Sequence, residues 1–342
     1  MMIKKLKNVK VNLFQLFVIL CVTGFIVFIA TSYSYSNNSD PFANETYTNV
    51  ESHCTPSIKR MKDFKYVKPI LFVDNNCEGL QFADLKSKLT DMLDRYARKN
   101  EINNASIYIK DFQSNDYLSI NETQTYVPAS LMKVALLISI LKMSESTPGF
   151  LDKQITFKIP YNSPKTQNII TKTIQLGSTY TVKELMTYMI KYSDNNATNL
   201  VASNIEGGLL EKVFSDFGLK APNSKNKDIN ITCAEYSCFM RALYNGAYLT
   251  KEHSEYALEL LITSDFENGL RKPIPKEYKI ASKFGESGNQ TEKQLHESGI
   301  VYLDNKAYLL TVMTKGASAE TLAKVISNIS EKVFTEMNGK PM

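Results

Sequence analysis

The chain has 342 residues, with 40 Lys and Arg against 35 Asp and Glu, and a formal net charge of +5. Four of the lysines (Lys4, Lys5, Lys7 and Lys10) lie in the first ten residues, so the rest of the chain carries a net charge of only +1. Nucleic-acid-binding proteins spread their basic residues over a face or a helix, so this distribution argues against nucleic acid as a partner. Hydrophobic residues make up 43% of the chain, which excludes disorder for its bulk.

The first predicted element is a membrane segment. Residues 13–30 are apolar except for Gln15 and Thr23, and about 20 such residues cross a bilayer. The lysines before them predict a cytoplasmic basic tail at residues 1–10, a transmembrane signal-anchor at 11–32, and a body outside a bacterial-type cell membrane. A cleaved signal peptide is the alternative, although its hydrophobic core usually runs about 7–15 residues.

Residues 33–79, whose first part is rich in Ser, Asn and Thr, are expected to form an extracytoplasmic stalk or linker. Cys54 and Cys77 flank a short segment and can form a disulfide in an oxidising compartment. Cys233 and Cys238 are expected to remain free thiols. The Cys and His spacings do not resemble a metal site, and a Gly-rich phosphate loop is lacking, so neither a metal nor a cofactor is expected.

The remaining elements alternate in type. An apolar stretch at residues 130–143 predicts a buried central helix. Strands at both ends, with helices between them, predict an α+β fold: a five-stranded antiparallel sheet flanked by helices, with an all-helical lobe inserted at about residues 130–265. The other predicted helices span 82–99, 182–192, 195–207, 233–244, 251–263 and 318–337, and the predicted strands span 105–112, 117–121, 278–285, 296–303 and 307–314.

Ser130 and Lys133 form a Ser-x-x-Lys pattern at the start of the buried helix, where residues three apart share one face. Burial disfavours the charged form of a lysine, and a neutral lysine can act as the base for a serine. The simpler interpretation is that Ser130 only caps the helix. Ser193-Asp194-Asn195 lies at a break between two predicted helices, where capping is again the simpler interpretation.

Four segments resemble the class A β-lactamase-like branch of the penicillin-recognising serine hydrolases: YVPASLMK, YTVKELMTYMIKYSDNNATNLV, KFGESG and GIVYLDNKAYLLTVMTKG. The similarity extends over roughly residues 80–340. It implies a serine hydrolase domain at residues 80–342 of the β-lactamase/transpeptidase-like fold, which forms an acyl-enzyme.

The resemblance assigns four catalytic residues. Ser130 would be the nucleophile and Lys133 its general base or proton relay. Ser193 would pass the proton to the leaving nitrogen, and Lys283 would supply positive potential for that relay and for a substrate carboxylate. Asp194 would orient its loop.

The resemblance also assigns substrate-binding residues. Asn195 would hold an amide of the substrate, and the backbone N–H groups of Ser130 and Glu286 would form an oxyanion hole. Gly285 and Phe284 would belong to the same substrate-binding strand. Phe284 departs from the family, which usually has Thr or Ser there, and a phenyl ring cannot bind the lactam carboxylate as a hydroxyl does.

A second departure concerns deacylation. Efficient β-lactamases of the family carry Glu-x-x-x-Asn beyond the Ser-Asp-Asn motif, and that Glu activates the water that releases the acyl group. Here residues 219–231 contain no Glu, and their one acid is Asp228, with Thr232 in the place of the Asn. The sequence therefore predicts slow deacylation.

His296 and Glu297 open a predicted strand. They either approach Glu286 and tune a base near the site, or form a surface cross-strand pair, which is the simpler interpretation.

Three functions remain open. The first is β-lactam hydrolysis with slow release, and the second is a peptidoglycan-directed D-Ala peptidase or acyl hydrolase. The third is a sensor or binding domain without turnover. The expected partners are a β-lactam or a peptidoglycan stem peptide and the membrane, and the protein is expected to be a monomer.

Overall fold

The computed structural model describes residues 55–61, 65–67, 69–161, 169, 171–221, 229–289 and 291–339. Residues 54–342 form one compact unit. The predicted basic tail and signal-anchor lie outside the described residues. Within the described part of the chain, none of the helices is long and apolar enough to cross a membrane.

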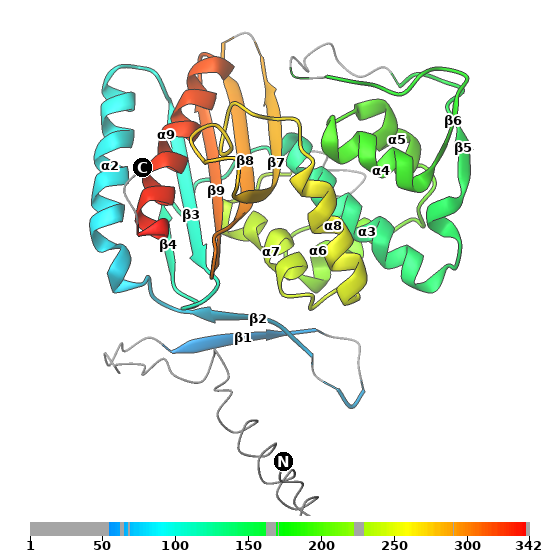
Figure 1. Cartoon of the computed structure of the whole chain (residues 1–342), viewed down its shortest axis with the longest axis horizontal. Coiled ribbons are helices and arrows are strands. Elements are labelled where there is room, and N and C mark those ends of the chain that lie inside the picture. Colours follow the sequence, from blue (N-terminus) through cyan, green and yellow to red (C-terminus); the bar gives the residue numbers. More distant parts are fainter. Residues whose placement is uncertain are drawn as a thin grey trace, which may run out of the picture. The chain divides into compact units, whose positions relative to one another are not determined.

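A five-stranded antiparallel sheet organises the compact unit (Figure 1). Its strand order is β4-β3-β9-β8-β7, so the β3–β4 hairpin pairs through β3 with the last strand, and β7 forms an edge. This arrangement confirms the predicted α+β fold. The strands are β3 (Asn104–Asp111), β4 (Tyr117–Ile120), β7 (Lys279–Gly288), β8 (Lys293–Tyr302) and β9 (Ala307–Gly316).

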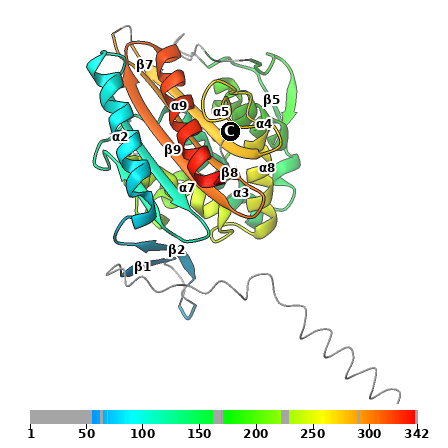
Figure 2. The same cartoon turned by 60° about the vertical axis from the view of Figure 1, so that its left-hand side comes forward.

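Helices cover both faces of this sheet. The helices α2 (Ala83–Arg98) and α9 (Ala319–Asn338) lie side by side on one face (Figure 2). Side chains alternate along β3, so Ile107 and Ile109 enter the core beneath α2 and α9 while Tyr108 enters the core beneath the helical lobe. Both cores consist of residues between 71 and 337, so the compact unit contains its own complete core.

The helical lobe surrounds α3 (Met132–Ser146), in which residues 133–141 are all buried, as the apolar sequence predicts. Capping boxes of Thr181 with Glu184 and of Thr232 with Glu235 begin the helices at residues 182 and 233. The short helix α6 (Leu209–Asp216), which begins after Gly208, was not predicted. The other helices of the lobe are α4 (Val182–Lys191), α5 (Asn195–Ala202), α7 (Cys233–Tyr244) and α8 (Lys251–Ile262).

The C-terminal part of the predicted stalk or linker packs on the domain. Strand β1 (Pro56–Arg60) pairs antiparallel with β2 (Ile70–Asn75), and Leu71 and Phe72 are buried in the domain core. The short apolar run of β2 packs on the domain, so this part of the chain is folded although the residues before it are polar. Two further short strands, β5 (Gln154–Thr156) and β6 (Thr179–Thr181), pair at the edge of the helical lobe.

The described cysteines are in two redox states. Cys77 is disulfide-bonded, whereas its expected partner, Cys54, lies outside the described residues. Cys233 and Cys238 are free thiols, as predicted.

Candidate active site

Ser130 lies in a single 3-10 turn (Ala129–Leu131) that leads directly into α3. The side chain of Ser130 is half-buried, and α3 begins without a side-chain cap, so the capping interpretation of Ser130 is wrong. Ala129 adopts φ +49°, a left-handed conformation that is costly for any residue with a Cβ and is common next to functional groups. The Tyr236 hydroxyl holds the turn by donating to the Leu131 carbonyl at 3.0 Å.

The amine of Lys133 points into the loop that carries Ser193. Its Nζ donates to the Ser193 carbonyl at 2.5 Å, to Ser193 Oγ at 3.1 Å and to Asn195 Oδ1 at 2.8 Å. Lys133 is only 4% exposed. Burial lowers its pKa to about 7, and the charge of Asp194 opposes this shift. About half of the Lys133 side chains are therefore neutral near pH 7.

As nucleophile and base, Ser130 Oγ and Lys133 Nζ are expected within about 2.6–3.2 Å of each other, or somewhat farther apart without substrate. The hydrogen bonds among the described residues do not include one between these two atoms. The three acceptors of the Ser193 loop occupy Lys133 Nζ instead. Spacing along a helix shows only that two side chains share a face, and it does not reveal which distant acceptors compete for the amine.

Ser193 joins the helical lobe to the edge of the sheet. Its buried Oγ accepts from Lys133 Nζ at 3.1 Å and from Lys283 Nζ at 2.9 Å. The predicted convergence of Ser193 and Lys283 is therefore found. Ser193 adopts φ +55°, the second strained non-glycine residue at this site.

Asp194 supports this strained loop. It caps α5 by accepting from Asn196 N at 2.9 Å, and its other oxygen accepts from Ile174 N at 2.9 Å. The Thr173 hydroxyl donates to the same carboxylate at 3.0 Å. Asp194 therefore has the orienting role that the sequence predicts, and capping describes Asp194 but not Ser193.

Lys283 is fully buried on the edge strand β7. Burial and the nearby charge of Lys133 hold the pKa of Lys283 well below its usual range, and Glu297 opposes the shift. Besides Ser193 Oγ, Lys283 Nζ donates to the Phe284 carbonyl at 2.9 Å. The amine of Lys283 is thus fixed toward Ser193 and kept from water.

The ring of Phe284 lies in the protein core, whereas the resemblance implies a position facing the substrate. Its ring is 3% exposed, stacks on Phe266 at a centroid distance of 4.5 Å, and lies 4.1 Å from Lys283 Nζ. The ring belongs to the core beneath α9. Phe284 therefore packs beside Lys283 and shields it, rather than offering a group to a substrate.

Gly285 brings the edge strand close to the nucleophile. A Cβ at this position would lie 2.6 Å from the Pro128 carbonyl oxygen and 2.9 Å from Leu131 N, so only glycine allows this approach. The next residue, Glu286, is placed on the same strand opposite Leu295 of β8. The strand and the turn thus meet where the resemblance places the oxyanion hole.

The predicted surface pair of His296 and Glu297 is wrong, because both side chains are fully buried. His296 Nδ1 accepts from Thr314 N at 3.1 Å, so Nε2 carries the proton and donates to the Val127 carbonyl at 3.1 Å. Burial lowers the pKa of His296 to about 3. His296 therefore braces, as a neutral side chain, the segment that precedes Ser130.

Glu297 braces the strand that carries Lys283. It accepts from Leu270 N at 2.8 Å and from Ser282 Oγ at 2.9 Å. Burial raises its pKa to about 7 against these hydrogen bonds. Glu286 is not the cross-strand neighbour of His296, whose partner in register is Gly285. The side chains of His296 and Glu297 are both buried because β8 lies between β9 and β7, and the sheet is covered by α9 on one face and by the helical lobe on the other.

Three acidic residues were considered as the base that activates water for deacylation: Asp228, Glu235 and Glu211. Asp228 lies outside the described residues. Glu235 is occupied by its capping box on α7, and Glu211 is exposed in the first turn of α6. Within the described part of the chain, the acidic, His and Cys side chains form no group that could hold a metal ion.

Ser130 lies three residues before a lysine of lowered pKa, and a second serine lies between two lysines, which is the arrangement expected of a serine hydrolase site for acyl transfer. The model of the β-lactamase enzyme family matches residues 84–337, and the chain belongs to this family.

Individual proteins similar to the chain are β-lactamases or penicillin-binding proteins. β-Lactamase VEB-1 of Pseudomonas aeruginosa is 26% identical over 256 residues, which cover 68% of this chain and 83% of that protein. Two solved structures share the fold. They are TLA-1 extended-spectrum β-lactamase (18% identity, TM-score 0.64, 74% of this chain and 99% of that one) and a mutant PBP-A in acyl-enzyme complex with penicillin G (20% identity, TM-score 0.63, 75% and 97%).

Proposed function

We propose that this serine hydrolase forms an acyl-enzyme at Ser130 with β-lactams or related amides and releases the acyl group slowly. The observation that carries the proposal is the position of Ser193 Oγ, within hydrogen-bonding distance of both Lys133 and Lys283. This chain of groups can move a proton from the nucleophile to a leaving nitrogen. The penicillin G acyl-enzyme of a PBP-A mutant with the same fold supports β-lactams as substrates.

We infer the acylation step from this arrangement of groups. Ser130 Oγ attacks the amide carbon while its proton passes to neutral Lys133, whose Nζ must turn from the Ser193 loop toward Ser130. The carbonyl oxygen becomes an oxyanion that backbone N–H groups of the turn and of β7 stabilise. The C–N bond then breaks, and the nitrogen takes a proton from Ser193 Oγ, which recovers one from Lys133.

Deacylation lacks an evident base. Water must attack the ester at Ser130, and a positioned base contributes about 10²–10⁴-fold to such a step. Residues 219–231 supply only Asp228, which is one methylene shorter than the Glu of efficient β-lactamases. We therefore expect a long-lived acyl-enzyme. A peptidoglycan-directed peptidase or a sensor domain would use the same acylation chemistry and differ only in substrate and release.

The N-terminal sequence supports a place outside the cytoplasm. An 18-residue apolar segment follows four lysines (residues 4–10), which is typical of a single-pass anchor with the domain outside. We infer a membrane-anchored, monomeric enzyme that acts on small β-lactams or on peptidoglycan stem peptides.

The test is covalent labelling of residues 54–342 with a fluorescent penicillin, followed by intact mass measurement. This unit retains Leu71 and Phe72, which belong to the core. We expect one acyl group per chain, lost in Ser130→Ala. Ser139→Ala is the matched control, because Ser139 also precedes a lysine by three residues but is buried mid-helix and donates to the Ala135 carbonyl. Labelling of the Ser130→Ala protein would disprove the nucleophile.

A further inference from the structure

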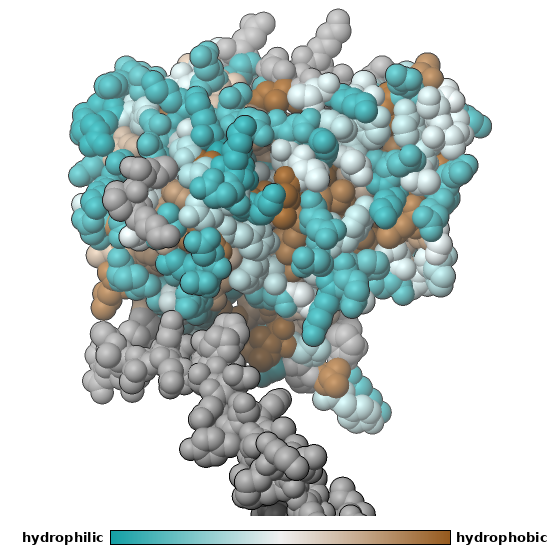
Figure 3. All heavy atoms as spheres, in the orientation of Figure 1, coloured by the Kyte–Doolittle hydropathy of each residue, from teal (hydrophilic) through white to brown (hydrophobic). Residues whose placement is uncertain are grey.

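The β1–β2 hairpin carries an unusual concentration of exposed apolar side chains. Ten large hydrophobic residues are exposed in the described part of the chain, and four of them lie between positions 58 and 70. These four are Ile58 (49% exposed), Tyr66 (84%), Val67 (57%) and Ile70 (47%). Apolar atoms are visible on the hairpin at the bottom of the space-filling view (Figure 3). Clustered exposed apolar groups mark an interaction surface more often than scattered ones do.

The same segment is basic. Residues 55–70 contain five basic residues, Lys59, Arg60, Lys62, Lys65 and Lys68, against one acidic residue, Asp63. Lys65 Nζ lies 5.0 Å from the ring of Tyr66, so a cation and an aromatic ring are presented together. Basic residues beside exposed aromatic and aliphatic side chains are typical of surfaces that bind anionic membranes.

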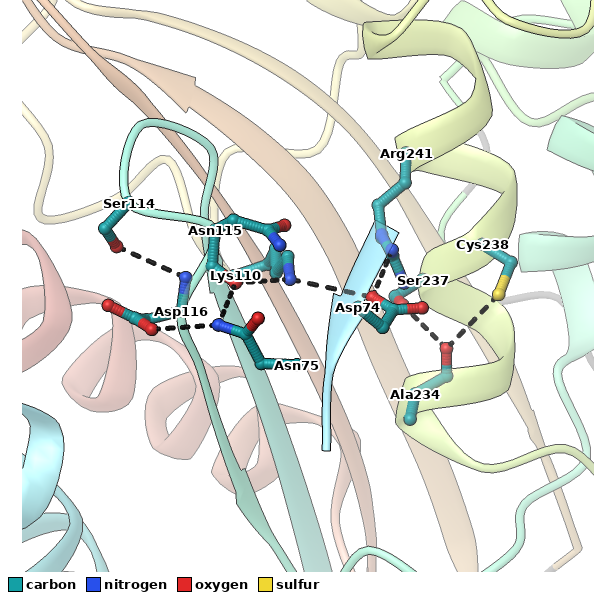
Figure 4. A network of polar contacts seen from close by, with 10 residues as sticks. All are labelled: Asp74, Asn75, Lys110, Ser114, Asn115, Asp116, Ala234, Ser237, Cys238 and Arg241. Atoms are coloured by element: carbon teal, nitrogen blue, oxygen red, sulfur yellow. Dashed lines mark hydrogen bonds and ion pairs between the residues drawn. The ribbon is translucent and has the colours of Figure 1, made fainter. Parts of the chain in front are cut away.

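The hairpin is firmly fixed to the domain. The carboxylate of Asp74 at the end of β2 forms ion pairs with Arg241 of α7 and, at 3.6 Å, with the buried Lys110 of β3 (Figure 4). Beside it, Asn75 Nδ2 donates to Asp116 Oδ1 at 3.2 Å (Figure 4). Leu71 and Phe72 of the same strand are buried in the core, so apolar contacts also hold β2 on the domain.

We propose that the β1–β2 hairpin docks on the surface of an anionic lipid bilayer. The inference rests on the membrane-anchored placement proposed above. Only residues 33–55 separate the predicted anchor from β1, so the hairpin is held at high effective concentration near the membrane. Its positive charge complements anionic headgroups, and its aromatic and aliphatic side chains suit the interface. A second copy of the chain, paired through the edge of β1, is the competing occupant.

Docking is tested with residues 54–342, which lack the anchor but contain the complete core. The protein is sedimented with vesicles of phosphatidylcholine alone and of phosphatidylcholine with phosphatidylglycerol, at 0.05 M and 0.5 M salt. We expect binding to the anionic vesicles at low salt, at least tenfold weaker binding to neutral vesicles, and loss of binding at high salt. Failure of the unmodified protein to bind, or equal binding to both vesicles, would overturn the proposal.

Variants locate the surface. Tyr66→Ser with Val67→Ser, and separately Lys65→Glu, should each weaken vesicle binding at least tenfold. Leu176→Ser is the matched control, because Leu176 is 59% exposed in the turn before β6, and it should bind as the unmodified protein does. Unchanged binding of the hairpin variants, or a concentration-dependent dimer that these variants abolish, would refute the docking surface.

The same samples separate this inference from the proposed function. Penicillin labelling at Ser130 reports that each variant is folded, and it should be unchanged in all of them. Labelling without vesicle binding would overturn the docking surface alone. Vesicle binding without labelling would overturn the proposed acylation and leave the docking surface supported.

Discussion

Acidification below pH 7 should slow the acylation of Ser130 because it protonates Lys133. The buried amine has a pKa of about 7, so about half of it is neutral at pH 7, about one tenth at pH 6 and about one hundredth at pH 5. Only the neutral amine can accept the proton of Ser130. The rate constant of acylation should therefore fall about tenfold for each unit of pH below 7 and level off above pH 8.

The assay is single-turnover labelling by a fluorescent penicillin between pH 5 and 9, with mass analysis of quenched samples. Lys133→Arg should abolish the pH-dependent limb together with most labelling, since a guanidinium stays protonated throughout this range. The Ser139→Ala control should reproduce the unmodified profile. A labelling rate that changes less than twofold between pH 5.5 and 8 would refute the role of Lys133 as the base.

Three further predictions concern the residues that shape the site. Gly285→Ala should slow labelling about 10²-fold while circular dichroism stays unchanged, because the added Cβ displaces β7 from the turn at Ser130; an unchanged labelling rate would contradict this. His296→Gln should make the melting temperature less sensitive to acid. Between pH 6.5 and 3, native His296 binds fewer protons than the unfolded side chain. The free energy of unfolding therefore decreases as the pH decreases, and at pH 5 it is about 2 kcal/mol lower than at neutral pH. An equally acid-sensitive variant would exclude this contribution. Phe284→Thr should lower the free energy of unfolding in urea by about 3 kcal/mol, because it empties a packed site. Faster labelling of this variant would instead place Phe284 in the substrate site.

Local sequence signals predicted most of the fold. The helix at residues 233–244 was predicted with its observed bounds, because the capping box of Thr232 and Glu235 specifies where it starts. The central helix followed from its uniform apolarity. By contrast, β1 was missed, because it is short and largely exposed and gains its place only by pairing with β2.

The site was predicted less completely, for physical reasons. Ser193 and Lys283 were placed together by the resemblance, and the structure joins them by a hydrogen bond. The hydrogen bonds of Lys133 depend on a loop 60 residues away, which no local pattern reveals. His296 and Glu297 are polar residues on a strand that is buried on both faces, so the usual association of polar side chains with the surface fails there.

In the proposed reaction, Ser130 is acylated readily and the acyl group is released slowly. The most direct measurement is the intact mass of residues 54–342 followed over time after mixing with excess penicillin, alongside the rate of penicillin hydrolysis. We expect a burst of one acyl group per chain on Ser130 that persists long after acylation is complete, with little further hydrolysis. Rapid, sustained hydrolysis without an accumulating acyl-enzyme would contradict it, and would show that Asp228 or another group activates the deacylating water.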